Sequence, residues 1–148
     1  MATYNSDKYS ATAQPPISSH GMSGNVKALF ATVVCSSSPA TTDTINFGYL
    51  PKNSRVIYAL LESTDMDTNG TPLLALHVGD AGSANRYFAA SAVGQAGTVA
   101  AATAVAGLGY LNTSQTLVTG VASTNAATGA AGTLYLTILY VVEESATS

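Results

Sequence analysis

The segment 133–143 carries apolar side chains on both faces of the β-strand that its alternation predicts. Every second position is apolar and is predicted to face a sheet core: Leu134, Leu136, Ile138, Tyr140 and Val142. The intervening positions include Tyr135, Leu139 and Val141, where a water-facing strand would carry charged and polar residues. A strand of this kind has to be covered on both sides. The chain should therefore fold as packed β-layers, and something must also cover its second face.

Short segments rich in β-branched and aromatic residues continue through the chain, separated by Gly, Pro, Asn, Asp and Ser. The predicted strands are 26–34, 44–50, 55–63, 73–78, 86–91, 116–122 and 133–143, with weaker candidates within 99–105 and around Tyr110. The length of 148 residues suits one domain, and no period of 20 to 50 residues repeats. The pattern predicts an all-β fold, a single jelly-roll-like β-sandwich of about seven to nine short strands.

Residues 1–25 are polar and contain the pair Pro15-Pro16, which is typical of an extended segment. We therefore expect an N-terminal arm at 1–25, followed by the β-sandwich domain at 26–148. Fully stretched, the arm would reach about 80 Å, far enough to lie across a neighbouring subunit. Tyr4, Tyr9 and Ile17 are the candidate anchors of such an arm. The alternative is a terminus without fixed structure.

Charged residues make up only 9% of the chain, compared with roughly 25% in typical soluble domains. Lys and Glu are depleted at the centres of interfaces because they are costly to desolvate. The composition therefore favours a surface that is covered by partners, and Tyr135, Leu139 and Val141 are the predicted inter-subunit face. Two alternatives remain: a solvated Ser/Thr-rich surface, and a second core layer within one sandwich for those three residues.

Charge, hydropathy and cysteine content exclude several classes of protein. The net charge is −3 and the five basic residues are scattered, which leaves no basic stripe for direct nucleic-acid binding. The least polar long stretch, 89–110, is made mostly of Ala, Gly, Thr and Ser, so it predicts no membrane span. Cys35 is the sole cysteine, so an intramolecular disulfide cannot form.

The run Asp65-Met66-Asp67-Thr68-Asn69-Gly70 matches the first half of a calcium loop, with oxygen ligands at alternate positions before a glycine. Asp65, Asp67 and Asn69 are thus weak calcium-ligand candidates. The twelfth position, which should supply a bidentate carboxylate, is Leu76. A hairpin turn without metal is the favoured interpretation, because Asp and Asn are common in turns.

No arrangement of residues indicates an active site or a cofactor. His20, His77 and Cys35 lack the spacing of a zinc site, and nothing in the sequence orients a Cys35/His77 nucleophilic pair. Asp80 and Arg86 flank the turn 79–85 and could pair across it as a surface ion pair. We therefore expect no enzyme and no cofactor; a hydrolase with an unrecognised Cys35/His77 site is the remote alternative.

Three segments resemble those of small β-sandwich structural proteins of tailed-bacteriophage virions, of the head decoration (cement) or capsid-associated type. The segments are Leu50-Pro51-Lys52-Asn53-Ser54-Arg55-Val56, the run from Leu76-His77-Val78-Gly79-Asp80 to Arg86-Tyr87-Phe88, and Ala131-Gly132-Thr133-Leu134-Tyr135-Leu136-Thr137-Ile138-Leu139-Tyr140. The resemblance covers about two thirds of the chain and rests on pattern, without a diagnostic signature.

The resemblance implies a non-enzymatic virion protein, assembled in the host cytoplasm, that decorates and stabilises the capsid. Its partners would be copies of itself, as trimers or other rings, and the major capsid protein, whose shell subunits it would bridge. The alternative is a carbohydrate- or receptor-binding β-module of a phage fibre or surface protein, with exposed Tyr as sugar platforms. Binding of glycans by the isolated subunit would favour this alternative.

Overall fold

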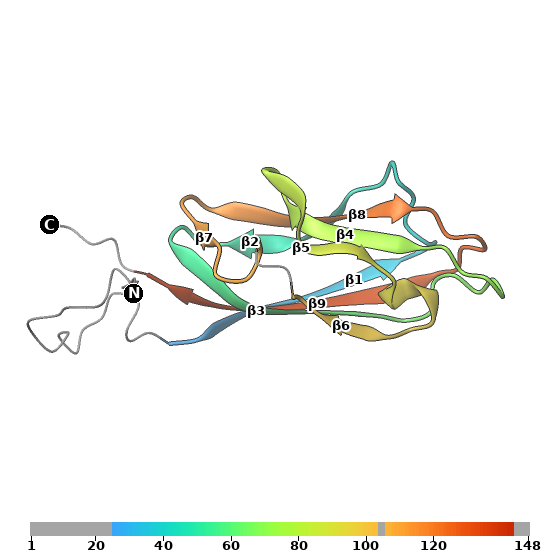
Figure 1. Cartoon of the computed structure of the whole chain (residues 1–148), viewed down its shortest axis with the longest axis horizontal. Helices are drawn as coiled ribbons and strands as arrows, with labels where there is room; N and C mark the ends of the chain where they lie inside the picture. Colours follow the sequence, from blue (N-terminus) through green and yellow to red (C-terminus); the bar gives the residue numbers. More distant parts are fainter. Residues whose placement is uncertain (1–24, 104–105, 144–148) are drawn as a thin grey trace, which may run out of the picture.

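The computed structural model describes residues 25–103 and 106–143. It contains nine β-strands and one short 3-10 helix, η1, at Val93–Gln95 (Figure 1). The strands are β1 Lys27–Cys35, β2 Ile45–Leu50, β3 Ser54–Ser63, β4 Ala75–Asp80, β5 Ser83–Ser91, β6 Val99–Ala101, β7 Leu111–Asn112, β8 Thr116–Thr124 and β9 Gly132–Val142. Every predicted strand is present, and both weaker candidates are short strands. Only β5 differs by more than two residues at an end, because it begins three residues before the predicted start.

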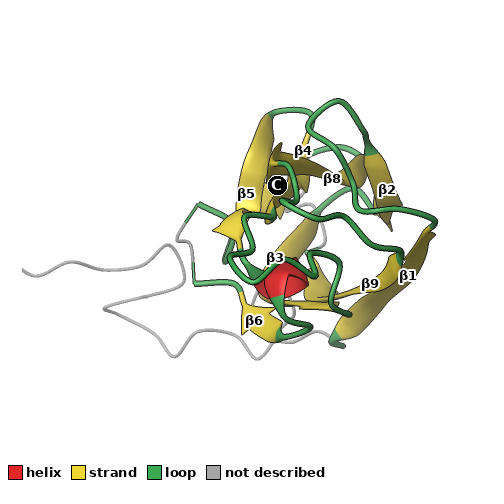
Figure 2. Ribbon diagram, turned by 90° about the vertical axis from the view of Figure 1, so that its right-hand side faces the viewer, coloured by secondary structure: helices red, strands yellow, loops and turns green. Residues whose placement is uncertain are grey.

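The strands form two antiparallel sheets that pack face to face (Figures 1 and 2). One sheet has the order β1-β9-β3-β6, with β7 also paired to β3, and the other has the order β2-β8-β4-β5. Successive strands switch between the sheets, except for the β4–β5 hairpin and for the short strands β6 and β7, which both pair with β3. This is the double Greek-key order of a jelly roll, so the predicted fold class is confirmed.

The core lies between the two sheets. Strand β9 runs between β1 and β3 and contributes Leu134, Leu136 and Ile138, each at most 1% exposed. The facing sheet contributes buried residues from β4 and β8, among them Leu76, Val78 and Val118. The predicted core face of β9 is confirmed over these positions, whereas Tyr140 is half-buried and Val142 lies beyond the core at the strand end.

One end of the sandwich is closed by the loop between β3 and β4 together with η1. Met66 and Leu74 are fully buried there, and the backbone N–H of Met66 donates to the carbonyl of Gly94. A Cβ atom at Gly94 would lie 2.6 Å from a methyl group of Leu74, so η1 packs closely against this buried side chain. The closed end fixes the loop that carries Asp65, Asp67 and Asn69.

The predicted N-terminal arm, apart from Asn25, falls outside the described residues. The arm and its anchors Tyr4, Tyr9 and Ile17 therefore stay predictions. Within residues 25–103 and 106–143, no helix is long and apolar enough to cross a membrane.

Candidate interaction surface and polar cleft

The sheet β1-β9-β3-β6 turns an apolar face to the outside of the sandwich, and we call it the outer face. Cross-strand register places its members on one side of the sheet, because directly opposed residues share a face. For example, Leu139 is opposed by Ala28 on β1 and by Tyr58 on β3. The large apolar members of the outer face are Phe30, Val34, Tyr58, Leu60, Val99, Tyr135, Leu139 and Val141.

Several of these side chains are strongly exposed. Phe30 is 76% and Val34 is 79% exposed, Val99 is 56%, and Tyr135 is 41%. Leu139 and Val141 are partly buried by their neighbours. Contiguous exposed apolar patches of this kind mark interaction sites on soluble proteins.

Small and polar residues fill the positions between the large side chains. Thr32 and Glu62 flank Tyr135, and Thr137 lies between Phe30 and Leu60. Charge is confined to Glu62 and to one end of the sheet, where Arg55 forms an ion pair with Glu143. The outer face thus carries few charged residues, as the centres of protein–protein interfaces do.

The structure places Tyr135, Leu139 and Val141 together on the outer face. None of them points into the space between the two sheets, and the described residues form no second core layer over them. Phe30, Val34 and Val99 also belong to this surface, although the sequence pattern did not assign them to it. For Phe30 and Val34, the sequence signal was the alternation of Phe30, Thr32 and Val34 along β1, which does not by itself reveal which face of the strand is exposed.

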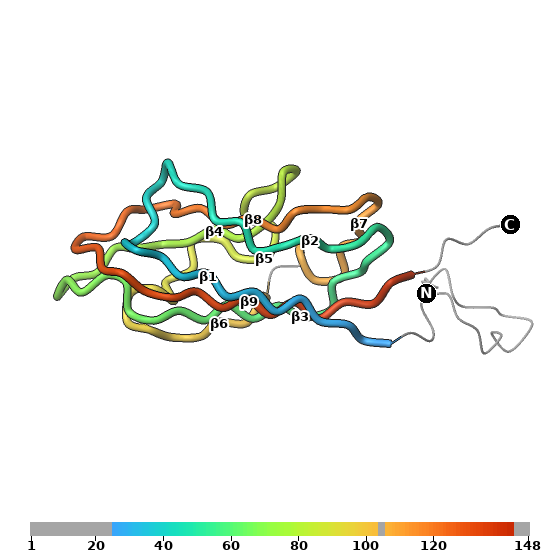
Figure 3. The backbone as a smooth tube through the Cα atoms, turned by 180° about the vertical axis from the view of Figure 1, so that it is seen from behind, coloured from blue at the N-terminus to red at the C-terminus, as the bar shows by residue number. Residues whose placement is uncertain are grey.

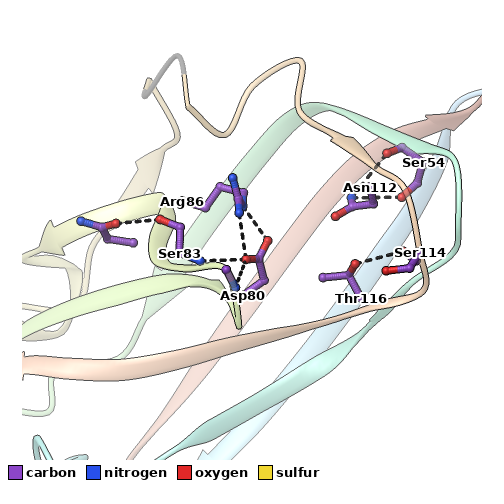
Figure 4. A network of polar contacts seen from close by, with 9 residues as sticks. Ser54, Asp80, Ser83, Arg86, Asn112, Ser114 and Thr116 are labelled. Atoms are coloured by element: carbon purple, nitrogen blue, oxygen red, sulfur yellow. Dashed lines mark hydrogen bonds and ion pairs between the residues drawn. The ribbon is translucent and has the colours of Figure 1, made fainter.

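A polar cleft of about 380 Å³ lies between the β4–β5 turn and the segment leading into β8 (Figure 4). The cleft is lined by residues 80–82, Arg86, Tyr110 and residues 112–117. Arg86 Nε donates to Asp80 Oδ2 at 2.6 Å, and Nη2 donates to Oδ1 at 3.0 Å. The predicted pairing of Asp80 with Arg86 is confirmed. The side chains are only 4% and 13% exposed, so this is a largely buried pair and not the surface pair that the sequence suggested.

The ion pair is fixed from several sides. The backbone N–H groups of Gly82 and Ser83 donate to Asp80 Oδ1, and burial works to raise the pKa of Asp80. The hydrogen bonds from Arg86 and the two amides outweigh burial and hold that pKa below its ordinary value. The hydrogen bond to Asp80 in turn raises the pKa of Arg86. The pair therefore stays ionised at neutral pH, and its charges cancel.

The aromatic groups beside the cleft are largely enclosed. The guanidinium carbon of Arg86 lies 3.7 Å from the ring centroid of Tyr110, so one face of that ring is occupied. Burial raises the pKa of Tyr87 to about 12. The Tyr87 hydroxyl and Asn112 Oδ1 are both buried, and the neighbouring Asn112 side chain works against the rise in the pKa of Tyr87. The cleft thus offers a sugar at most one face of Tyr110 as a stacking platform.

The three calcium-ligand candidates accept hydrogen bonds from backbone amides. Asp67 Oδ2 accepts from Leu73, Leu74 and Ala127, and its Oδ1 accepts from Thr128. Asp65 Oδ1 accepts from the N–H of Asp67, and Asn69 Oδ1 accepts from that of Thr71. The loop joins β3 and β4, which lie in different sheets, so it is a crossover and not a hairpin turn. Within the described ranges, no group of three or more His, Cys, Asp or Glu side chains gathers that could hold a metal ion.

His77 and Cys35 lie on different sheets, in β4 and at the end of β1. His77 Nδ1 accepts the backbone N–H of Ala90 at 2.9 Å, which gives the imidazole a structural role in the β4–β5 pair. Burial, with a smaller contribution from Asp43, raises the pKa of the Cys35 thiol. A thiol in this state is a poor nucleophile at neutral pH. The structure does not bring these two side chains into a catalytic arrangement.

No protein-family model matches the chain, and no curated protein is significantly similar to it. Among solved structures, it is similar to a chain of the capsid asymmetric unit of cyanophage Pam1, with a TM-score of 0.76, 38% identity and coverage of 92% of this chain and 98% of that one. A chain of the capsid of Ralstonia phage GP4 matches with a TM-score of 0.74 and 35% identity, over 82% of this chain and 87% of that one.

A third similarity extends the fold to a more distant structure. A chain in the acid-stable capsid of Helicobacter pylori bacteriophage KHP30 matches with a TM-score of 0.53 at 16% identity, over 81% of this chain and 95% of that one. The resemblance seen in the sequence is confirmed, and a location in the virion follows from the two closer similarities. The chain belongs to a family of bacteriophage capsid-associated structural proteins that includes the matching chains of the Pam1 and GP4 capsids.

Proposed function

We propose that the protein decorates and stabilises a phage capsid as a homo-oligomer that bridges neighbouring subunits of the major capsid protein, and that it catalyses no reaction. The observation that carries the proposal is the outer face, on which Tyr135, Leu139 and Val141 lie along β9, the strand between β1 and β3. The similarity to chains of two phage capsids supports the capsid as the place where this face is covered.

Burial of the outer face provides the driving force. Apolar surface removed from water contributes about 25 cal/mol per Å², and aromatic side chains such as Phe30 and Tyr135 supply the most area. The face carries little charge to desolvate, so the cost of covering it is low. A shell presents the same site many times, and modest single contacts then add up through multivalency.

The arm at 1–25 would add a second contact in this proposal, with Tyr4, Tyr9 and Ile17 as anchors. An extended segment of this length can cross from one shell subunit to the next, because it spans about 80 Å when stretched. Two contact sites on one subunit allow it to bridge two shell subunits.

Binding to capsids that lack the protein tests the proposal. Full-length protein is mixed with such shells, and co-sedimentation and electron microscopy report the bound amount and its arrangement. We expect a regular array with the wild-type protein, and a loss of binding of about tenfold or more for Tyr135→Ser combined with Leu139→Ser.

Tyr49→Ser is the matched control, because Tyr49 is 60% exposed on β2 of the opposite sheet. It should bind as the wild-type protein does. Equal loss in both variants would overturn the assignment of the outer face. If the wild-type protein does not bind to the capsids but binds glycans in solution, this result would instead support the carbohydrate-binding alternative.

A further inference from the structure

The two sheets end in edges that differ greatly in how well they are protected. Strand β6 has three residues and β7 has two, so neither offers a long row of free backbone groups. Strand β2 has six residues and a register shift between Asn46 and Gly48. Strand β5 pairs with β4 through two register shifts. Short and bulged edge strands are two of the devices by which proteins prevent unwanted strand pairing.

Strand β1 has neither form of protection. Its nine residues pair with β9 without interruption, from Lys27 opposite Tyr140 to Cys35 opposite Gly132. It lies at the margin of its sheet, beside β9 (Figures 2 and 3). It contains no proline, and its single charged residue, Lys27, stands at its first position. A long apolar edge of this kind is a template for a further strand.

The sequence of β1 is complementary to itself in the antiparallel direction. If two copies pair about Ala31, then Phe30 of one copy lies opposite Thr32 of the other, and Val34 lies opposite Ala28. Each large side chain thus meets a smaller one, and aromatic with β-branched pairs are favourable across strands. Lys27 lies opposite Cys35, so no like charges are opposed. Directly opposed residues also share a face, as antiparallel pairing requires.

We infer that β1 is a docking edge for a second copy of this chain, which adds its own β1 antiparallel about a two-fold axis at Ala31. The sheets of the two copies then join into one, and their outer faces become continuous. The most exposed large apolar side chains on that face, Phe30 and Val34, are covered in part by the partner strand.

The inference deepens the proposed homo-oligomer by naming its contact, but it does not require the capsid. The contact is a strip one strand wide and about 30 Å long, given a rise of 3.4 Å per residue. Because neighbouring strands lie about 4.8 Å apart, a strip of this length buries far less than the roughly 800 Å² per partner of a stable complex. We therefore expect the free dimer to be weak and to need covalent trapping.

One added cysteine is enough to test for a disulfide between two copies, because Cys35 is the only natural cysteine of the chain. In the inferred register, Lys27→Cys faces Cys35 of the second copy, and opposed residues of antiparallel strands lie about 4.5–5.5 Å apart at Cα, within the range of a disulfide. Residues 27 and 35 of one copy lie about 27 Å apart along the strand, so the bond cannot form within a chain.

The experiment oxidises the full-length Lys27→Cys variant with diamide and measures covalent dimer by non-reducing electrophoresis and mass spectrometry. Ala28→Cys is the matched control, since residue 28 is also exposed but points to the other face of the strand. We expect at least about tenfold more dimer from Lys27→Cys, and its loss when Cys35→Ser is added. Equal dimer yields from Lys27→Cys and Ala28→Cys would overturn the inference.

Hydrogen exchange on the wild-type protein supplies a measurement that needs no substitution. The amides of β1 that point away from β9 should gain protection as protein concentration rises. Protection that is already complete in a monomer would overturn the inference, because the chain itself would then cover the edge. The disulfide experiment contains no capsids, so its outcome does not depend on shell binding. The dimer proposal and the capsid-binding proposal can therefore be refuted independently of each other.

Discussion

The carboxylate of Asp67 accepts a hydrogen bond of 2.9 Å from the backbone N–H of Thr128, 61 residues further along the chain. The same carboxylate accepts from Ala127 in that loop and from Leu73 and Leu74 in its own loop. One side chain, only 1% exposed, therefore joins the β3–β4 crossover to the β8–β9 connection. The backbone bond from Thr68 N to Thr128 O runs beside it.

Asp67→Asn should lower the midpoint of thermal unfolding clearly. The amide group of Asn cannot accept hydrogen bonds on its nitrogen side, so buried backbone donors lose their acceptor. Asp65→Asn is the control, because Asp65 Oδ1 accepts one bond and an amide oxygen can replace it. Calorimetry of the three proteins measures the effect. Equal midpoints for Asp67→Asn and Asp65→Asn would contradict the role given to Asp67.

Stability should fall in acid because of Asp67 and Asp80. Burial works to raise the pKa of each, but hydrogen bonds to backbone amides, and to Arg86 in the case of Asp80, hold both pKa values below the ordinary one. An unfolded Asp binds a proton near pH 3.9, so below that pH the unfolded state holds more protons than the folded state. These contributions are therefore complete above about pH 4 and are lost as pH falls further towards the folded pKa values.

Urea unfolding at pH 7, 5 and 3 measures this dependence. The two carboxylates should add little change between pH 7 and 5 and a marked loss of the free energy of unfolding at pH 3. Asp67→Asn removes one of the two groups, so its loss between pH 5 and 3 should be smaller. An unchanged slope in that variant would show that Asp67 does not carry the acid dependence.

Gly79→Ala should destabilise the β4–β5 hairpin. A Cβ atom at residue 79 would collide with the carbonyl oxygen of Ser83 and would lie 2.6 Å from the carbonyl carbon of Ala84, both of which are backbone atoms. Backbone atoms cannot move aside as the end of a flexible side chain can, so we expect Gly79→Ala to lower the free energy of unfolding by about 1–3 kcal/mol. Gly70→Ala is the matched control, since nothing lies within 4 Å of its Cβ position. Chemical denaturation distinguishes the two, and a cost at residue 70 as large as at 79 would refute the explanation.

The strands could be predicted because their signals are local. Alternation within 133–143 and the apolar run within 55–63 each identify a strand without knowledge of its neighbours. The order β1-β9-β3-β6 is non-local, and so is the choice of which side of β1 faces outward. Phe30 and Val34 therefore could not be assigned to the outer face, although Tyr135, Leu139 and Val141 could be grouped by their shared position on one strand.

In the polar sites, only contacts between residues close together in the sequence could be predicted. Asp80 and Arg86 lie six residues apart around a turn, and their pairing was foreseen. The contact of Arg86 with Tyr110 depends on a segment that is distant in sequence, and so does the burial of the pair. At Asp67, the alternating oxygen pattern suggested a cation, whereas the donors that the carboxylate meets come from residues 127 and 128.

Ile138→Ala tests the packing on which the outer face depends. Ile138 is fully buried between the sheets, and truncation of a buried Ile leaves a cavity that costs about 2–5 kcal/mol. Thr137→Ala, one position earlier on β9, changes a half-buried side chain on the outer face and should cost less than about 1 kcal/mol. Urea denaturation of both variants gives the two free energies. A cost below about 0.5 kcal/mol for Ile138→Ala would mean that β9 presents the opposite face to the core, and the outer face would then be buried.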